Sequence, residues 1–314
     1  MRDVALLLAL LRAAPAAGKG LHEHDGGAGG RDGRRTKPWR ASEACVATGG
    51  AAPSVAIIGA GGNIGSRLHE VLSANCGWKV TGYDREPRLS PPRAKYPITP
   101  MSAASIPAAE LAAYDAVVYL GGLTGRAACD RHTREQTLSE NVDDPLALAS
   151  RMGPSQLLVF ASTSAITEGS GQRSAREDTA VRTELLDSYS SSMHQREAAM
   201  RQLAASKPAG APQLVGLRFG TVIGVSPGQR VDLGPPAMLK SAYTTGVLKV
   251  AHPETSRAFL WLEDLCRGIS RTIELRRGGA AIAPPATAHH SKRSAPSSSS
   301  MAPAAPPPFA IYHL

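Results

Sequence analysis

A glycine-rich turn links an apolar run to a helical segment near residue 60. The stretch VAIIGAGGNIGSRL, residues 55–68, places Gly59, Gly62 and Gly65 three residues apart. A Cβ at such positions would block a pyrophosphate or the contact between strand and helix. The backbone N–H groups at the helix start, including those of Asn63 and Ile64, would point at phosphate oxygens, aided by the helix dipole. The pattern predicts a dinucleotide site, and a glycine turn without a ligand is the alternative.

A carboxylate follows at the spacing expected for such a site. Asp84 ends the next apolar run, about 20 residues after Gly65. A carboxylate there accepts hydrogen bonds from ribose hydroxyls and repels a 2′-phosphate, so NAD is favoured over NADP. The neighbouring Arg85 weakens that preference.

A third group of reactive side chains lies in YSSSMHQRE, residues 189–197. Tyr189, Met193 and Glu197 are four residues apart, so on a helix they share one face. The stripe has two interpretations. It is a half-buried part of the core, or it is a catalytic tyrosine whose usual partner has been replaced.

The elements that must position these residues alternate between short apolar runs and longer helical segments. We predict strands at 55–58, 79–82, 96–99, 116–120, 157–161 and 214–218, and helices at 64–75, before 151 and at 187–207. Strands and helices in alternation favour an α/β fold with a doubly wound parallel Rossmann sheet.

The chain divides into three parts by composition. Residues 1–52 are expected to be a disordered leader or targeting segment, 53–277 a Rossmann domain with substrate-lobe segments from about 221, and 278–314 a low-complexity tail. The first 18 residues have weak signal-peptide or transit-peptide character. A cytoplasmic protein is the leading expectation, and a targeted protein remains the alternative.

Several motifs in order resemble the extended short-chain dehydrogenase/reductase family, in particular the NAD-dependent epimerase/dehydratases that act on nucleotide-activated sugars. They are the GxxGxxG spacing, DAVVYLGGL (115–123), SENVDDPLAL (139–148), FASTSAIT (160–167), LRFGTVIGVSPGQRVDL (217–233) and RAFLWLEDLCRGI (257–269). The resemblance covers about Ser54 to Leu275. The chain then passes into low complexity, so the substrate lobe is expected to be small and truncated.

The resemblance implies roles for individual residues. Thr163 and Tyr189 match the catalytic Ser/Thr and Tyr, which bind the substrate oxygen while hydride moves to or from the nicotinamide. Gly121 and Asn141 match cofactor-site positions, although Gly121 and Gly122 replace more usual alanines. Ser226, Arg230 and Arg257 match the substrate side, where the two guanidinium groups would grip a diphosphate.

Methionine stands where this family has a lysine four residues after the tyrosine. In the family that lysine binds the nicotinamide ribose and lowers the tyrosine pKa. The Met193 thioether carries no charge and donates no hydrogen bond. We expect neither His194 nor Arg196 to substitute fully, because at one and three positions further on they point away from the direction of Met193. An impaired or altered enzyme, an NAD-binding regulatory or scaffold protein without turnover, and an error in the sequence remain open.

Charge and cysteine content limit other functions. Of the net charge of +9, the segments 1–52 and 275–314 carry 12 Lys/Arg and 5 Asp/Glu, so only +2 is left for 53–274 and no nucleic-acid surface is indicated. Four scattered cysteines predict free buried thiols, and neither metal-ligand spacing nor a membrane-length apolar run is seen. The expected partners are a nucleotide-sugar substrate and, as a candidate assembly, a second copy in a homodimer.

Overall fold

The computed structural model describes residues 51–85, 95–168, 175–207, 210–232, 234–248, 250, 257–277 and 307–314. The leader at 1–50 and the low-complexity residues 278–306 lie outside this range. Within the described residues, no helix has both the length and the apolar character needed to span a membrane.

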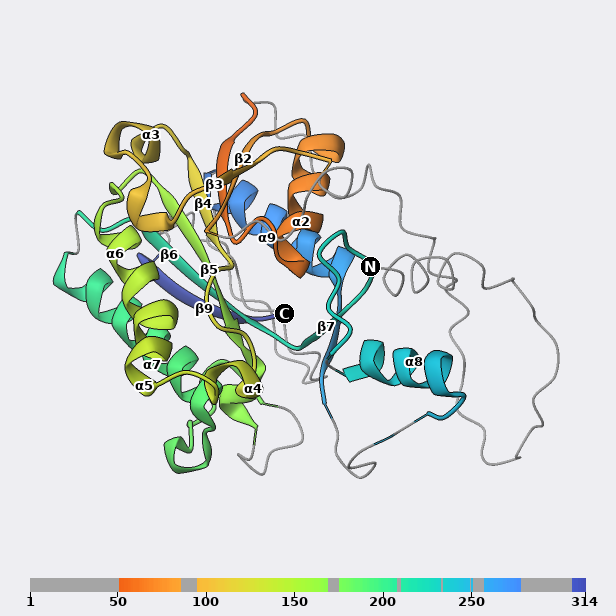
Figure 1. Ribbon diagram of the computed structural model, residues 1–314. Helices are drawn as coiled ribbons and strands as arrows, with labels where there is room; N and C mark the ends of the chain where they lie inside the picture. Colours follow the sequence, from red (N-terminus) through yellow and green to blue (C-terminus); the bar gives the residue numbers. More distant parts are fainter. Residues whose placement is uncertain are drawn as a thin grey trace, which may run out of the picture.

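A seven-stranded sheet forms the centre of the molecule (Figure 1). Its strands are β1 (Ser54–Ile58), β2 (Lys79–Asp84), β3 (Ile98–Pro100), β4 (Ala116–Tyr119), β5 (Leu157–Thr163), β6 (Gln213–Phe219) and β9 (Phe309–His313). The spatial order is β3-β2-β1-β4-β5-β6-β9 and every pairing is parallel. The chain therefore runs outward from β1 in one direction, reverses, and continues from β4 in the other, which is the doubly wound arrangement predicted from the sequence.

Helices cover both faces of this sheet, which is why its central strands are continuous apolar runs. On one face α2 (Asn63–Glu70) and α9 (Leu262–Arg277) pack against side chains such as Val55 and Val118. On the other face α3 (Ala108–Ala112), α6 (Asp144–Ser150) and α7 (Ser188–Ser206) pack against side chains such as Val117 and Leu158. Figure 1 shows both layers.

The remaining elements connect or extend this core. Short helices α4 (Arg126–Cys129) and α5 (Arg134–Leu138) precede a π-helical segment (Ser139–Asp143), and another π-helical segment (Val71–Asn75) continues α2. A separate two-stranded parallel sheet pairs β7 (Thr221–Ile223) with β8 (Phe259–Trp261). Helix α8 (Gly234–Thr245) has no buried residue and projects from the main body in Figure 1.

The predicted strands and helices are found within one to two residues of their expected ends, and three strands, β7, β8 and β9, were missed. Phe309–His313, which the sequence assigned to the low-complexity tail, pairs with β6 as the edge strand β9. Gly216 of β6 makes room for it, because a Cβ there would lie 2.3 Å from Cδ1 of Ile311. A five-residue strand whose pairing partner is almost 100 residues away leaves only a weak local signal.

The cysteines differ in part from expectation. Cys129 and Cys266 are free and buried as predicted, whereas Cys76 is disulfide-bonded. In the described part of the chain, no three His, Cys, Asp or Glu side chains are grouped as metal ligands.

Candidate functional site

The glycine turn follows β1 at the carboxyl edge of the sheet. Gly59 has φ +83° and its N–H donates to the Tyr83 carbonyl oxygen at 2.8 Å. A Cβ on Gly59 would lie 3.0 Å from the backbone of Gly121, and a Cβ on Gly65 would lie 2.2 Å from the Gly59 carbonyl oxygen. Glycine is therefore required at Gly59 and Gly65 for the turn to close against β4 and for α2 to pack on it.

The first turn of α2 is suited to an anion. Its N-cap residue is Gly62, which provides no side-chain cap, and the first turn holds no acidic residue. The backbone N–H groups of Asn63 and Ile64 lie in this turn, where the positive end of the helix dipole favours a phosphate.

Asp84 lies beside this turn at the end of β2. Its carboxylate Oδ2 accepts a hydrogen bond from the Gly61 N–H at 2.9 Å. The adjacent Arg85 is directed elsewhere, since its guanidinium donates to Glu140 at 2.8 Å and lies 3.8 Å from Asp144. Arg85, the cation whose position next to Asp84 weakened the predicted preference for NAD, is thus paired with two carboxylates.

A second loop, residues 224–232, covers the glycine turn. The Ser226 hydroxyl donates to Asn63 Oδ1 at 2.6 Å, and the Gly228 N–H donates to the Ser66 hydroxyl at 3.1 Å. A Cβ on Gly228 would lie 2.6 Å from the Gly62 carbonyl oxygen. Ser226, expected to face substrate, is instead 2 % exposed and joins the two loops. Gly228 was missed, although the Pro-Gly pair at 227–228 is a turn signal.

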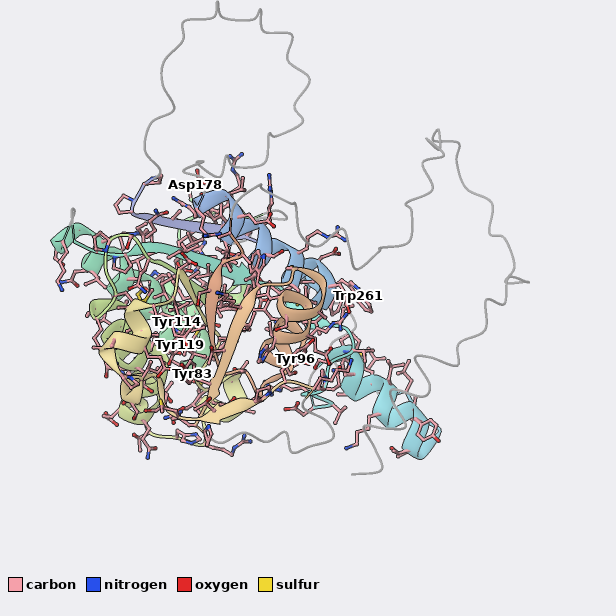
Figure 2. The ribbon with its side chains drawn as sticks, turned by 90° about the horizontal axis from the view of Figure 1, so that it is seen from above. Tyr83, Tyr96, Tyr114, Tyr119, Asp178 and Trp261 are labelled. Carbon is pink, nitrogen blue, oxygen red and sulfur yellow. The ribbon has the colours of Figure 1, made fainter. Side chains whose placement is uncertain are left out.

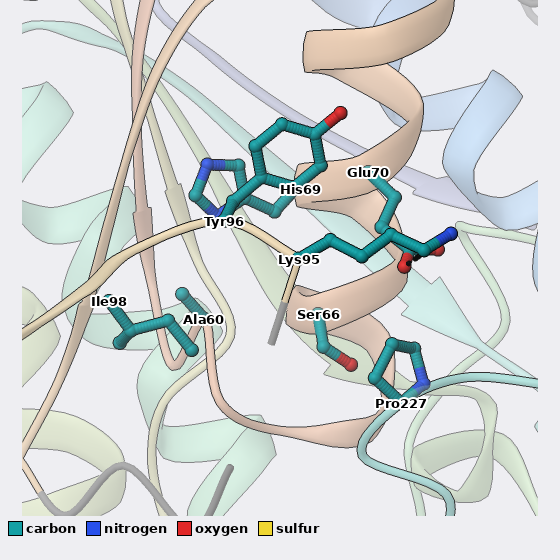
Figure 3. Close-up of a pocket in the computed structure, with 8 residues that line it drawn as sticks. All are labelled: Ala60, Ser66, His69, Glu70, Lys95, Tyr96, Ile98 and Pro227. Carbon is teal, nitrogen blue, oxygen red and sulfur yellow. Dashed lines mark ion pairs between the residues drawn. The ribbon is translucent and has the colours of Figure 1, made fainter. Parts of the chain in front are cut away.

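A crevice beside this contact is too small for a nucleotide. Figure 3 shows Tyr96 stacked on His69 and Lys95 paired with Glu70, with Pro227 near the start of α2. The enclosed volume is about 10 Å³, which is room for roughly one water molecule.

Thr163 and Tyr189 come together at the same edge of the sheet. Thr163 is the last residue of β5 and its Oγ1 accepts from the Ala165 N–H at 3.2 Å, as a strand-end cap would. The Tyr189 phenol, in the first turn of α7, lies close enough to Thr163 for the threonine to affect its pKa. Burial raises the pKa of Tyr189, while the charge of Arg196 and the neighbouring Thr163 oppose that rise.

Polar contacts fix helix α7 at its first turn, where Tyr189 lies. The Asp187 carboxylate caps the helix by accepting from the Ser190 N–H at 2.7 Å. Further along, Glu197 accepts hydrogen bonds from Arg218 at 2.8 and 2.7 Å and from the Ser162 hydroxyl at 2.6 Å. The register of α7 on β5 and β6 is therefore set by buried polar contacts at its start and middle.

Met193 is 2 % exposed, so its thioether is part of the packed interior. His194 lines a separate cavity of about 230 Å³ that also borders Glu197 and Arg218, so it does not face Tyr189. This position agrees with the expectation that His194 points away from the direction of Met193.

The direction expected for Arg196 differs from its position in the structure. It was judged by its angle from Met193, but seven residues are nearly two helical turns, so Arg196 returns to the face of Tyr189. Its guanidinium is 1 % exposed and donates to the carbonyl oxygens of Asn141, Ala161 (2.9 Å) and Gly121 (3.4 Å).

The guanidinium of Arg196 lies over one aromatic ring. Its Cζ is 5.6 Å from the ring centroid of Tyr119, within cation–π distance. Tyr119 belongs to the same apolar cluster as Tyr83 and Tyr114, and Figure 2 shows all three in one region. Burial raises the pKa of Tyr119 to about 12, so it is a neutral phenol near pH 7.

Asn141 uses its side chain within the protein. Its Oδ1 accepts from the Leu123 N–H at 2.8 Å, and its Nδ2 donates to the Leu123 carbonyl oxygen at 3.1 Å and to the Ser192 hydroxyl at 2.9 Å. The residue is fully buried and links the loop after β4 to α7. Contact with a cofactor stays a prediction.

The two substrate-side arginines are ion-paired at the surface. Arg230 contacts Asp232 through Nε at 3.0 Å and Nη2 at 2.7 Å, and its charge also lowers the pKa of Tyr189. Arg257 contacts both carboxylate oxygens of Glu168 at 3.0 Å. Arg230 is thus near the tyrosine, and Arg257 is held by the segment that follows Thr163.

Together these residues place two kinds of chemistry at the carboxyl edge of the sheet. The glycine turn and α2 can hold a dinucleotide diphosphate, and the Asp84 carboxylate lies beside this turn. The Thr163 and Tyr189 hydroxyls can bind and protonate or deprotonate an oxygen on a substrate carbon.

Solved structures with a similar fold are known. The chain is similar to MoeE5 in complex with UDP-glucose and NAD, with 26% identity over 73% of this chain and 74% of that chain and a TM-score of 0.59. It is also similar to TunA, an NAD-dependent NDP-hexosamine 5,6-dehydratase (23%, 69% and 70%, 0.58), and to UDP-glucuronic acid 4-epimerase from Bacillus cereus in complex with NAD (20%, 70% and 73%, 0.57). No curated protein matches the chain.

The family comparison covers most of the described residues. Residues 55–282 match the model of the NAD dependent epimerase/dehydratase family. That range includes the glycine turn, Asp84, Thr163 and Tyr189. The chain therefore belongs to the NAD dependent epimerase/dehydratase family.

Proposed function

We propose that the protein binds NAD and transfers a hydride between a nucleotide-activated sugar and the nicotinamide ring. Tyr189, as phenolate, takes the proton of the sugar hydroxyl while Thr163 holds the oxygen, and hydride leaves the same carbon for NAD. The observation that carries this proposal is the position of Tyr189, in the first turn of α7, beside Thr163, the last residue of β5, at the edge of the sheet where the glycine turn lies.

The choice of NAD is supported by the fit of the glycine turn. The Cβ contacts at Gly59 and Gly65 leave a cradle that only glycine permits, and the uncapped start of α2 suits a diphosphate. Asp84 would hold the adenosine ribose, and the pairing of Arg85 with Glu140 leaves less positive charge for a 2′-phosphate. When bound, NAD supplies the hydride acceptor.

The substrate class is supported by the relatives and by two arginines. MoeE5 is known in complex with UDP-glucose, and the Bacillus cereus epimerase with UDP-glucuronic acid. In this chain Arg230 and Arg257 would exchange their carboxylate partners, Asp232 and Glu168, for diphosphate oxygens. Epimerase and dehydratase outcomes begin with this transfer of hydride from the sugar to NAD, whereas a reductase outcome runs the transfer in the opposite direction, from NADH to the sugar.

A second function is favoured by one observation. Met193 is buried and carries no charge, so an NAD-binding protein without turnover, acting as a regulator or scaffold, has the same fold and the same glycine turn. The two functions differ only in whether the sugar is converted.

The experiment is a panel of UDP- and dTDP-sugars with NAD, assayed for product and for NADH. We expect conversion by the wild type and loss of about 10²- to 10⁴-fold in kcat for Tyr189→Phe. Tyr243→Phe, an exposed tyrosine on α8, is the matched control and should keep full activity. Conversion that persists in Tyr189→Phe would contradict the catalytic assignment.

Cofactor binding is measured separately by calorimetry. Gly62→Val should weaken NAD binding in both functions, because a side chain there approaches the Gly59 carbonyl oxygen and the phosphate site. If the wild type binds no dinucleotide, both functions are refuted. NAD binding without conversion of any sugar favours the regulatory function, and strong activity in Met193→Lys would then show an otherwise intact site.

A further inference from the structure

Arg196 is a buried cation whose positive charge no described carboxylate offsets. Its guanidinium is 1 % exposed, and its partners are backbone carbonyl oxygens from the ends of β4 and β5 and from the segment before α6. Among the described residues, the phenolate forms of Tyr119 and Tyr189 would stabilise its cationic form. Burying a charge in this way is costly, so its presence calls for a compensating anion.

The helix geometry directs this charge toward Tyr189. At about 100° per residue, seven residues bring Arg196 to within about 20° of Tyr189, whereas Met193 is offset by about 40°. Long side chains on a helix lean toward its N-terminus, which is where Tyr189 lies. The end of β4 gives the guanidinium room: Gly122 has φ +115°, and a Cβ there would lie 3.1 Å from Nη2 of Arg196.

We propose that Arg196, about two helical turns after Tyr189 in α7, supplies the positive charge near Tyr189 that the uncharged Met193 does not supply. Arg196 is then a positioning residue, because it acts through the phenolate of Tyr189 and not on the substrate. The proposal rests on the proposed function of Tyr189 and deepens it. It also gives a physical reason why a methionine is tolerated at position 193.

The other groups that face Tyr189 do not provide this charge as effectively. Cys129, on α4, has a pKa raised by burial, so its thiol stays neutral near pH 7. Thr163, on β5, is uncharged. Arg230, on the loop at 224–232, shares its charge with Asp232 at 2.7 Å and is partly exposed, so solvent screens it. Arg196 remains protonated because a guanidinium does not lose its proton in proteins.

The test measures the ionisation of Tyr189 directly, without turnover. The full chain is labelled with fluorotyrosine, and the resonance of Tyr189 is identified by its absence in Tyr189→Phe. We expect Arg196→Met to raise the pKa of Tyr189 by about 1–3 units, which is the effect of removing a nearby opposite charge. Arg196→Lys should keep most of the wild-type value.

Two further variants separate electrostatics from structure. Arg201→Met removes the same charge from the same helix at an exposed position and should leave the Tyr189 resonance unchanged. In Arg196→Met/Met193→Lys, a new cation four residues after the tyrosine should restore the lower pKa. If Arg196→Met fails to fold, Arg196→Gln, which keeps a hydrogen-bond donor, is titrated in its place.

The outcomes are distinct. The proposal is overturned if Arg196→Met, or Arg196→Gln in its place, changes the Tyr189 pKa by no more than Arg201→Met does. That result would hold even if sugar conversion is found. Failure to rescue by Met193→Lys in a folded double variant would also count against it. Absence of conversion of every sugar by the wild type would refute the proposed enzyme function while the titration still decides the role of Arg196.

Discussion

The buried ion pair between Glu197 and Arg218 should be a major source of stability for the half of the molecule that holds Tyr189. The side chains are 3% and 4% exposed and are joined by two hydrogen bonds of 2.8 and 2.7 Å. Ser162, next to Thr163 in β5, donates a third at 2.6 Å. Glu197→Leu would leave the Arg218 guanidinium buried without a carboxylate.

The expected loss follows from this geometry. Removing one partner of a buried pair costs about 3–5 kcal/mol, and the bond from Ser162 adds about 1 kcal/mol. Domains are usually stable by about 5–15 kcal/mol, so Glu197→Leu should lose a large fraction of its unfolding free energy. Activity should fall with it, because Glu197 and Tyr189 are on the same helix.

Urea denaturation of wild type and variants measures the free energy of unfolding. Glu184→Leu is the matched control, since its pair with Arg182 is 63% and 54% exposed and should contribute at most about 1 kcal/mol. In Glu197→Leu/Arg218→Met the uncompensated charge is gone and part of the stability should return. A loss below about 1 kcal/mol for Glu197→Leu, or a double variant no more stable than the single one, would refute the reasoning.

Two other predictions concern the glycine turn and acid stability. Gly65→Ala should disrupt the start of α2 and lower NAD affinity more than Gly77→Ala. A Cβ on Gly65 would lie 2.2 Å from the Gly59 carbonyl oxygen, whereas a Cβ on Gly77 meets nothing within 4 Å. Equal NAD affinities of the two variants by calorimetry would contradict this. Burial and the charge of Arg218 lower the pKa of His313, so the unfolded chain binds the proton more readily and stability should fall as pH drops below about 6.5. Thermal melts across that range should show a smaller loss for His313→Gln, and an equal loss would exclude this histidine as the cause.

The local pattern of the sequence was enough for most of the fold. Apolar runs alternating with helical segments predicted β1, β2, β4, β5 and β6, because strands buried on both faces need continuous apolar side chains. The spacing of Gly59, Gly62 and Gly65 predicted the turn at the start of α2. The strand at Phe309–His313 was missed, because its burial depends on pairing with β6, far away in the chain.

The sequence by itself determined which residues could do chemistry at the ends of these strands. Asp84 follows from its spacing after the glycine turn, whereas Thr163 and Tyr189 follow from the resemblance to the epimerase/dehydratase family. Only the tertiary structure decided the partners of those residues. It directed Arg85 to Glu140 and Ser226 to Asn63, and it brought the guanidinium of Arg196 among carbonyl oxygens from three separate segments. The environment of a buried charge is set by groups distant in sequence that converge on it, so periodicity along one helix could not reveal it.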